Sequence, residues 1–302
     1  MLGDFKTNED YMPYFHSLKK NCVTGYTYAS IVGGQTANTE FELLTGNTLG
    51  FLSAGTTAFQ LYIHGQMPSL VSNLKAEGYS GNKAMHPFNP YNYNRPAVYK
   101  DFGFTDFIDK FDFPKNVKRV REYISDEANV DRIISEYEKN RKKTDQPFYM
   151  YNMTIQNHSP YDKDAANFKQ PIKIESSKYD AEANRYLNLI KYSDDSLKQL
   201  TGYFEKCKEP TIILFLGDHQ PRLTDEFMNK ITNGQYQTWS SEQMMKRYQV
   251  PFVIWANYDI KEQHIEKTSM NYIQSILTKT AGVKMTGYQL SLIHISEPTR
   301  LL

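Results

Sequence analysis

The stretch TIILFLGDH, residues 211–219, decides the fold class. After Thr211, residues 212–216 form an unbroken apolar run, which is typical of a strand buried on both faces of a parallel sheet. The run ends at Gly217-Asp218-His219, where a glycine turn is followed by two polar side chains. Ligands bind beyond the carboxyl ends of strands in open α/β sheets, so the sequence points to a functional site here.

Outward from this stretch, short apolar runs alternate with amphipathic helical stretches. This alternation predicts an α/β fold with a mostly parallel central sheet and helices on both faces. The expected strands are 82–86, 147–155, 211–216 and 250–256, and the expected helices are 68–78, 129–140, 178–206 and 270–281.

The bulk composition is that of an ordinary globular protein. The chain has 302 residues, 40% of them hydrophobic, and a formal net charge of +1. Such a balanced charge gives no basic field, so we expect no nucleic-acid partner. Two cysteines, Cys22 and Cys207, are too few for a disulfide framework, and we expect two unpaired thiols. No apolar run reaches the roughly 18 residues that a membrane span needs.

Both ends of the chain depart from the pattern. Residues 290–302 (LSLIHISEPTRLL) do not continue the preceding pattern and resemble the translation of a sequencing adapter. We therefore predict a non-native tail there and exclude His294 from the site. A parallel α/β domain normally opens with a hydrophobic strand, and none precedes Asp4. We expect a fragment whose domain, residues 1–289, lacks its first strand and so has an unpaired sheet edge.

Polar side chains follow three of the predicted strands: His86, His158 and the pair Asp218-His219. For any single histidine a hydrogen-bonded structural role is the better interpretation, whereas the set at strand ends favours a site. Asp218 and His219 would give one divalent ion a hard oxygen and an imidazole nitrogen. The alternative is that Asp218 only caps its loop.

A second signal is GGQTANTEFE, residues 33–42, in which two glycines precede a threonine that opens a predicted helix. Free amides and the helix dipole at such a position favour a bound phosphate or sulfate. A metal-bound Thr36 hydroxyl there can attack phosphorus. Alternatively, Thr36 or Asn38 is a helix N-cap with Glu40 or Glu42 in a capping box, and spacing alone does not separate the two interpretations.

A third, weaker signal is Asn92-Tyr93-Asn94-Arg95. The guanidinium of Arg95 offers a bidentate fork for phosphate oxygens, and the ring of Tyr93 can form a wall of a headgroup pocket. The default interpretation of a lone arginine is a surface residue.

Four motifs in this order resemble those of the lipoteichoic acid synthase / phosphoglycerol transferase family, in the sulfatase and alkaline phosphatase-like superfamily. They are GGQTANTEFE (33–42), MHPFNPYNYNR (85–95), TIQNHSPY (154–161) and LGDHQP (216–221). The resemblance extends from about Gly3 to about Gly287. It implies an alkaline phosphatase/sulfatase-like fold and a sulfatase-like catalytic domain within residues 1–289.

The resemblance also implies roles for the site residues. Thr36 matches the nucleophile that forms a phosphoglycerol-threonine intermediate. Together with Asp218 and His219, Thr36 matches the ligands of one divalent ion, Mn²⁺ or alternatively Mg²⁺. His158 matches the histidine that contacts the transferred phosphate or its leaving group.

Three further positions match residues that bind the substrate headgroup in the family: His86, Tyr93 and Arg95. The implied reaction takes glycerol phosphate from phosphatidylglycerol, releases diacylglycerol and passes the phosphoglycerol to a glycerophosphate polymer, glycolipid or glycan.

Family members carry transmembrane helices before a catalytic domain that lies outside the cytoplasmic membrane. The resemblance therefore implies a membrane partner through N-terminal helices that residues 1–302 do not show. The family's metal site also uses a glutamate on the first strand, and Glu9 and Asp10 are too far along the chain to match it. With Thr36, Asp218 and His219 alone, we expect an under-ligated ion and an inactive fragment.

Three alternatives stay open. Most sulfatases of this fold need a Cys or Ser in a C/S-x-P-x-R context, and neither Cys22 nor Cys207 is followed by that pattern. A phosphodiesterase or phosphonate hydrolase with a threonine nucleophile fits the motifs equally well. The third alternative is a non-catalytic binder of glycerophosphate polymers.

Overall fold

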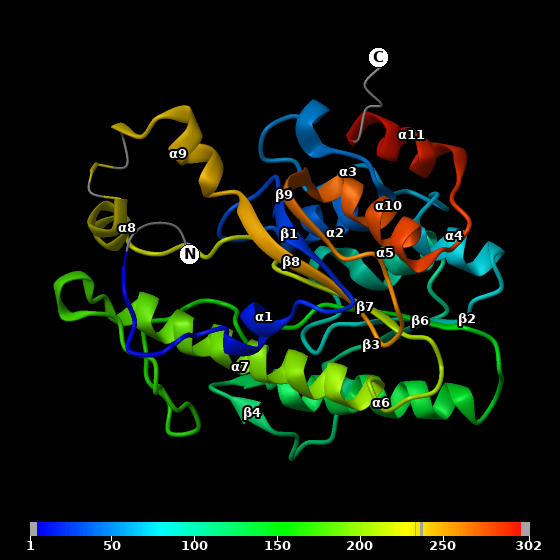
Figure 1. Cartoon of the computed structure of the whole chain (residues 1–302), viewed down its shortest axis with the longest axis horizontal. Coiled ribbons are helices and arrows are strands. Elements are labelled where there is room, and N and C mark those ends of the chain that lie inside the picture. Colours follow the sequence, from blue (N-terminus) through cyan, green and yellow to red (C-terminus); the bar gives the residue numbers. More distant parts are fainter. Residues whose placement is uncertain (1–4, 233, 236–237, 297–302) are drawn as a thin grey trace.

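The computed structural model describes residues 5–232, 234–235 and 238–296. Within these ranges, two neighbouring sheets lie between two helical layers (Figure 1). The predicted α/β class with helices on both faces is therefore confirmed.

The larger sheet has the strand order β7-β8-β1-β9. Its strands are β1 (Cys22–Tyr28), β7 (Ile212–Leu216), β8 (Gln249–Ala256) and β9 (Gln263–Ser269). Strand β8 runs antiparallel to both β7 and β1, whereas β1 and β9 are parallel, so this sheet is mixed.

The smaller sheet is wholly parallel, as the sequence predicts, with the order β3-β2-β6. Its strands are β2 (Ser80–Met85), β3 (Asp106–Ile108) and β6 (Phe148–Asn152). A separate two-stranded hairpin, β4 (Arg119–Val120) and β5 (Tyr123–Ile124), lies close to it in sequence.

Strands β6 and β7 are edge strands that border one large cavity of about 920 Å³. Side chains of both strands line it, as do Leu43 from one helical layer and Leu197 from the other. Among the described residues, no recorded backbone hydrogen bond joins β6 to β7. The two sheets therefore meet across a cavity instead of forming one continuous ladder.

Helices α2, α4, α5 and α10 cover one side of the sheets, and α1, α6 and α7 cover the other (Figure 1). The helices are α1 (Pro13–Ser17), α2 (Thr36–Thr45), α3 (Ala58–Leu61), α4 (Leu70–Ala76), α5 (Arg95–Phe102), α6 (Asp126–Arg141), α7 (Ala181–Phe204), α8 (Asp225–Thr232), α9 (Ser241–Lys246), α10 (Met270–Ala281) and α11 (Gly287–Ser296). Single 3₁₀ turns are η1 (Leu49–Phe51), η2 (Asn92–Asn94), η3 (Lys110–Asp112) and η4 (Ser176–Lys178).

Polar N-cap side chains set the starts of α6 and α7. Hydrophobic periodicity alone predicts these starts at the wrong residues. The Ser125 side chain accepts a hydrogen bond from the amide of Ala128, so α6 begins three residues before the predicted start at 129. Asp180 likewise accepts from the amide of Ala183 and starts α7. Each cap contributes about 1 kcal/mol to its helix.

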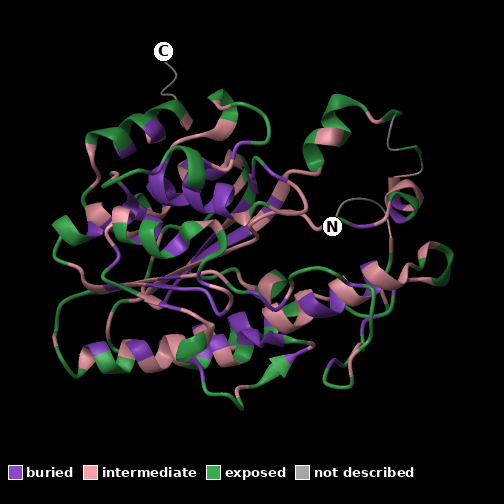
Figure 2. Ribbon diagram, turned by 180° about the vertical axis from the view of Figure 1, so that it is seen from behind, coloured by how far each residue is buried: buried purple, intermediate pink, exposed green. Residues whose placement is uncertain are grey.

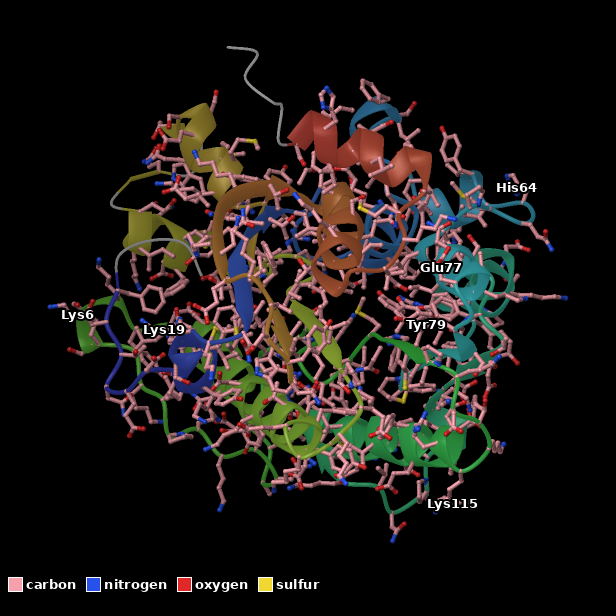
Figure 3. All side chains as sticks on the ribbon, turned by 45° about the vertical axis from the view of Figure 1, so that its right-hand side comes forward. Lys6, Lys19, His64, Glu77, Tyr79 and Lys115 are labelled. Carbon is pink, nitrogen blue, oxygen red and sulfur yellow. The ribbon has the colours of Figure 1, made fainter. Side chains whose placement is uncertain are left out.

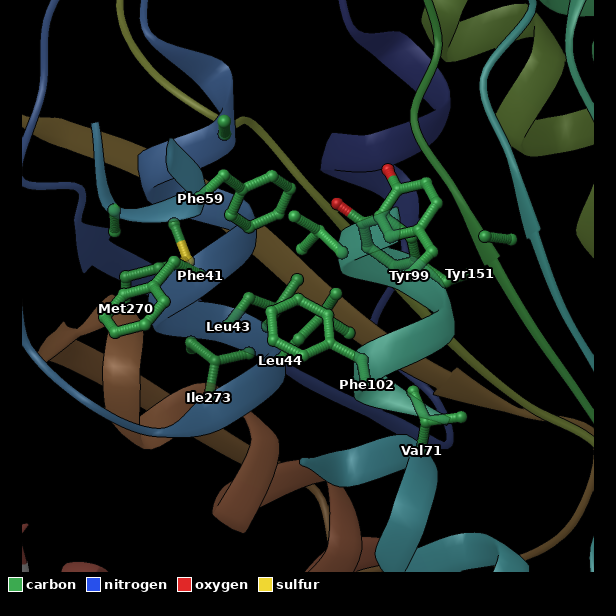
Figure 4. Close-up of a cluster of buried hydrophobic side chains, with 14 of the residues drawn as sticks. Phe41, Leu43, Leu44, Phe59, Val71, Tyr99, Phe102, Tyr151, Met270 and Ile273 are labelled. Carbon is green, nitrogen blue, oxygen red and sulfur yellow. The ribbon is translucent and has the colours of Figure 1, made fainter. Parts of the chain in front are cut away.

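The main core packs α2, α5 and α10 against the sheets (Figure 4). Phe41, Leu44 and Phe102 are almost wholly buried in it. Figure 2 shows that buried residues concentrate where helices face strands, while the outer helix faces are exposed. The charged side chains of Lys6 and Lys115 and the ring of His64 project from separate parts of the surface (Figure 3).

The last described helix, α11, includes residues 290–296 of the predicted tail. Its Leu292 side chain is 6% exposed and lies near Gly46 after α2. Residues 297–302 lie outside the described part of the chain. That the tail is non-native, and that the domain ends at residue 289, stay predictions.

Across the described ranges, none of the helices combines the length and the apolarity that crossing a bilayer requires.

Candidate active site

The loop that leads from β1 into α2 lies against the loop that follows β7. Val32 forms a parallel bridge with Gln220, and the amide of Gly33 donates to the Gln220 carbonyl at 2.9 Å. Gly33 has φ +73°, and a Cβ there would come within 2.8 Å of the Arg222 Cβ. A glycine is needed for this close approach, which brings the start of α2 to the end of β7.

Thr36, the first residue of α2, meets the Asp-His pair at this junction. Its Oγ1 donates to Asp218 Oδ2 at 2.9 Å and lies 3.4 Å from His219 Nε2. Asp218 Oδ2 and His219 Nε2 are 3.1 Å apart. The other ring nitrogen of His219, Nδ1, lies 2.9 Å from the carbonyl of Gln220. A carbonyl only accepts, so Nδ1 donates and Nε2 keeps its lone pair for the cluster.

Neither helix-capping alternative occurs. The N-cap of α2 is Gln35, in a left-handed conformation with φ 62°, and no side chain caps the helix. The Asn38 amide group instead donates to the Thr56 carbonyl and accepts from the Ala58 amide. The Thr36 hydroxyl therefore faces Asp218 and does not satisfy its own helix.

The three converging atoms suit a divalent ion. Thr36 Oγ1, Asp218 Oδ2 and His219 Nε2 are hard oxygen and imidazole donors, of the kind that Mn²⁺, Mg²⁺ and Zn²⁺ accept. Within the described ranges, no third His, Cys, Asp or Glu completes a cluster with Asp218 and His219. Asp10 instead bonds to His16 Nδ1 and the amide of Met12, both at 2.8 Å.

His86, which directly follows β2, is a buried neutral imidazole. It is 4% exposed, and its Nδ1 donates to the Met153 carbonyl at 2.9 Å. Burial, together with the positive charge of Arg95, lowers the pKa of His86 to about 4. At neutral pH its Nε2 is therefore unprotonated and can accept a hydrogen bond from a substrate hydroxyl.

His158, six residues after β6, is an exposed side chain on the cavity wall. Its Nδ1 lies 2.6 Å from the Ser159 carbonyl and 3.4 Å from the Tyr123 hydroxyl. Its ring stacks on Phe88 with centroids 6.2 Å apart. The contact to a carbonyl makes Nδ1 the donor, which leaves Nε2 as the nitrogen that can exchange a proton with a ligand.

Arg95 lies in a buried ion pair. Its Nη2 and Nε donate to Glu40 Oε1 at 2.6 and 3.2 Å, and both side chains are at most 2% exposed. The hydroxyl of Tyr99 donates to the other carboxylate oxygen of Glu40. The ring of Tyr93 lies over the Arg95 guanidinium at 5.1 Å. The fork of Arg95 is thus directed at a protein carboxylate, and Tyr93 covers it.

All seven residues that the sequence predicts for the site nevertheless line the same cavity: Thr36, His86, Tyr93, Arg95, His158, Asp218 and His219. Sequence reasoning missed three residues that hold this arrangement: Glu40, Tyr99 and Arg121. Their partners are 35 to 59 positions away in the chain, so no local pattern could reveal them.

The fold assigns the chain to a structural class. Its fold is that of the alkaline phosphatase superfamily. Streptococcus pyogenes phosphoglycerol transferase GacH, solved with sn-glycerol-1-phosphate, aligns with a TM-score of 0.79 and 20% identity over 97% of this chain and 73% of that one. Lipoteichoic acid synthase LtaP from Listeria monocytogenes aligns with a TM-score of 0.72 and 22% identity over 95% and 69% of the two chains.

The family follows from the sequence profile. The Sulfatase family profile matches residues 2–283, so the chain belongs to the sulfatase family. A putative cyclic beta-1,2-glucan modification protein of Rhizobium meliloti is 32% identical over 295 residues, 95% of this chain and 44% of the relative. Lipoteichoic acid synthase of Staphylococcus aureus is 28% identical over 196 residues, 62% of this chain and 28% of the relative. The chain thus spans less than half the length of these two curated relatives.

Proposed function

We propose that this chain carries the catalytic core of a phosphoglycerol transferase in which Thr36 is the nucleophile. The observation that carries the proposal is the convergence of Thr36 Oγ1 with Asp218 Oδ2 and His219 Nε2, at 2.9 and 3.4 Å, where helix α2 begins. Helix N-termini stabilise phosphate through free amides and the helix dipole. A hydroxyl held there by a carboxylate is placed to attack a bound phosphodiester.

In the first step, Thr36 Oγ1 forms a bond to the phosphorus of a phosphatidylglycerol headgroup. The bond from phosphorus to the diacylglycerol oxygen breaks, and the Thr36 hydroxyl proton moves toward Asp218 Oδ2. His158, which enters the step as an imidazolium, donates its Nε2 proton to the departing oxygen, and diacylglycerol leaves. General acid catalysis of this kind is worth about 10²- to 10⁴-fold in rate.

In the second step, an acceptor hydroxyl attacks the phosphorus of the phosphoglycerol-threonine. Its proton goes to His158 Nε2, the bond to Thr36 Oγ1 breaks, and the Thr36 oxygen takes back the proton held by Asp218 Oδ2. We propose that His86 Nε2 and Tyr93 orient the glycerol hydroxyls, since both residues line the cavity and Nε2 is unprotonated. Arg95, paired with Glu40, sets the position of Tyr93.

Thr36, Asp218 and His219 would hold the divalent ion, which we propose to be Mn²⁺ or Mg²⁺ and which when bound lowers the pKa of an alcohol and neutralises phosphate charge. Ligands other than these three residues would occupy the remaining coordination positions of the ion.

The acceptor is a hydroxyl-bearing polymer or glycan. The names of the relatives, a lipoteichoic acid synthase and a putative cyclic beta-1,2-glucan modification protein, support both acceptor classes. Because phosphatidylglycerol is a membrane lipid, we propose that the reaction takes place at a membrane surface. The similarity to lipoteichoic acid synthase supports the outer face of the cytoplasmic membrane.

The test is turnover by the full-length protein with phosphatidylglycerol and Mn²⁺, measured as diacylglycerol release with and without an acceptor. Thr36→Ala should abolish release while Mn²⁺ affinity changes little. Thr280→Ala is the matched control, since its hydroxyl bonds only within α10, to the carbonyl of Ile276. Mass spectrometry of Thr36 in the wild type should detect the phosphoglycerol adduct.

Each alternative has its own outcome in this assay. Undiminished release by Thr36→Ala would overturn the nucleophile assignment. Equal release with and without acceptor, yielding free glycerol phosphate, would show a hydrolase. Binding of glycerophosphate polymer without turnover would show a non-catalytic binder. A formylglycine sulfatase is disfavoured because Cys22 is buried in β1 and Cys207 follows α7, and neither lines the cavity.

A further inference from the structure

We infer that Arg121 is the positioning residue that fixes His158 for proton transfer, an inference that rests on the proposed function. Its guanidinium reaches across from the β4–β5 turn to the loop that carries His158. Nη1 donates to the Pro160 carbonyl at 2.6 Å, and Nη2 donates to the carbonyls of Gln156 and His158, both at 2.7 Å. One side chain therefore binds three carbonyls within five residues of the loop.

Two tyrosine rings lie close to the guanidinium. Its central carbon lies 5.2 Å from the ring centroid of Tyr123 and 5.8 Å from that of Tyr161. Tyr161 ends the same loop, and its hydroxyl donates to the Asn157 carbonyl at 2.9 Å. Stacking between aromatic faces restricts the rotation of a guanidinium and aligns its donors in one plane.

The backbone at Arg121 adopts an unfavourable conformation that the side chain helps to hold. Its φ is 56°, in the left-handed region that costs a non-glycine residue about 1–2 kcal/mol. Asn167 secures this turn by accepting from the Arg121 amide at 3.1 Å and donating to the Arg121 carbonyl at 3.0 Å. Glycine or asparagine would suit such a turn better, so an arginine here is explained by what its side chain does.

These contacts determine how the imidazole of His158 is oriented. The carbonyl of Ser159 and the hydroxyl of Tyr123 flank Nδ1, and Phe88 supports the ring. Those contacts orient the ring only if the loop backbone is fixed, and the carbonyls that Arg121 binds belong to that backbone. Arg121 thus acts through His158 and presents Nε2 to the departing oxygen in a set direction.

Lysine cannot reproduce this arrangement. An ammonium group is a compact point charge whose three donors diverge from one atom, so it cannot match the spacing of carbonyls that two guanidinium nitrogens bind. Arg121→Lys keeps the positive charge but should release the loop. The expected loss is in kcat, by about 10- to 100-fold, because the proton-transfer contribution falls while the headgroup contacts stay. KM and Mn²⁺ affinity should change less than about threefold.

The experiment compares two substrates in the full-length protein: phosphatidylglycerol and a p-nitrophenyl phosphodiester of glycerol. Nitrophenolate departs without a proton, so a residue that acts through His158 should matter little for it. We expect Arg121→Lys and His158→Ala to lose turnover of phosphatidylglycerol and to keep most of the rate of the initial nitrophenolate burst, which reports the first step alone. The double variant should be no slower than His158→Ala alone. Arg119→Lys, in the same hairpin, is the matched control.

Three results would overturn the inference: unchanged kcat in Arg121→Lys, an equal loss with both substrates, or losses that multiply in the double variant. Amide hydrogen exchange at residues 156–160 gives a readout without turnover, and it should accelerate in Arg121→Lys but not in Arg119→Lys. If Thr36→Ala remains active, the proposed function fails. If Thr36→Ala and His158→Ala are inactive but Arg121→Lys is normal, only this inference fails.

Discussion

The two halves of the candidate site are built on different sheets and held by different forces. The threonine half (Thr36, Asp218 and His219) follows strands of the larger sheet, and side chains bond directly to one another. The histidine half (His86, Tyr93 and His158) follows strands of the smaller sheet, where both imidazoles bond to backbone carbonyls. Under the proposed function, the first half would hold the cation and the second would contact the substrate, so the two tasks would rest on different sheets.

One ion pair connects the two halves. Glu40 belongs to α2, the helix that Thr36 begins, and Arg95 begins α5 beside Tyr93 of the histidine half. Burial lowers the pKa of His86 most, the Arg95 charge lowers this pKa further, and the Glu40 charge partly offsets that effect.

The largest expected effect comes from breaking this connection. Arg95→Met leaves the Glu40 carboxylate, which is fully buried, without its cation. Removing one partner of a buried pair destabilises a fold by about 3–5 kcal/mol. Urea unfolding should show this loss, and Arg185→Met, whose partner Asp164 is exposed, should lose much less stability. Equal losses in the two variants would contradict the connecting role.

The next largest effect should distinguish the two halves, because only the threonine half is expected to bind Mn²⁺. Asp218→Ala should lower turnover by about 10²- to 10³-fold, and it should also weaken Mn²⁺ binding, measured by calorimetry. His158→Ala should lower turnover and leave Mn²⁺ binding unchanged. The exposed Asp259 provides the control variant Asp259→Ala. Weakened Mn²⁺ binding in His158→Ala would break the division into two halves.

A pH effect should distinguish His86 from an exposed histidine. The native pKa of about 4 lies below the unfolded value of 6.5, so the unfolded chain binds more protons between these values. The native state therefore loses stability as pH falls from about 6.5 to about 4, by on the order of 3 kcal/mol. His86→Gln should remove this loss, whereas His64→Gln should retain it, as measured by urea unfolding across that pH range.

The smallest expected effect concerns one hydrogen bond within the threonine half. The Thr39 hydroxyl donates to the Asp218 carbonyl at 2.8 Å and is almost completely buried. Thr39→Val keeps the shape and removes the bond, so stability should fall by about 1 kcal/mol and Mn²⁺ affinity should fall slightly. Thr201→Val, which loses its hydrogen bonds within α7 and to the Tyr14 hydroxyl of α1, should cost at least as much stability without changing Mn²⁺ affinity.

The strand-end positions could be predicted because apolar runs end at polar residues in this chain. Residues 212–219 are such a case, and the structure ends β7 at Leu216. The expected strand 82–86 (NKAMH) is not an apolar run, but it also ends at a histidine, and β2 ends at Met85. In contrast, β1 reads CVTGYTY and β9 reads QHIEKTS. Neither is an apolar run, because β9 is an exposed edge strand and Gly25 of β1 lies too close to the Ile265 carbonyl for a side chain.

The buried supports could not be predicted, since they depend on distant partners. The sequence alone suggests that Arg95 is a surface arginine, because its partner Glu40 lies 55 positions earlier in the chain. Arg121 lies in an ordinary turn until the loop after β6 folds over it. Local patterns identify chemically capable residues, whereas the groups that hold them depend on the tertiary fold.

The strand order of the larger sheet has a consequence for how the protein folds. Strand β1 pairs only with β8 and β9 in the described structure. Cys22 therefore cannot pair with Trp255 until the ribosome has added more than two hundred further residues. Such nonlocal pairing is slow because the loop must close before any contact forms. The smaller sheet needs only residues 80–152 and can form during synthesis. The histidine half would thus be assembled early, and the Thr36 hydroxyl would meet Asp218 only as folding ends.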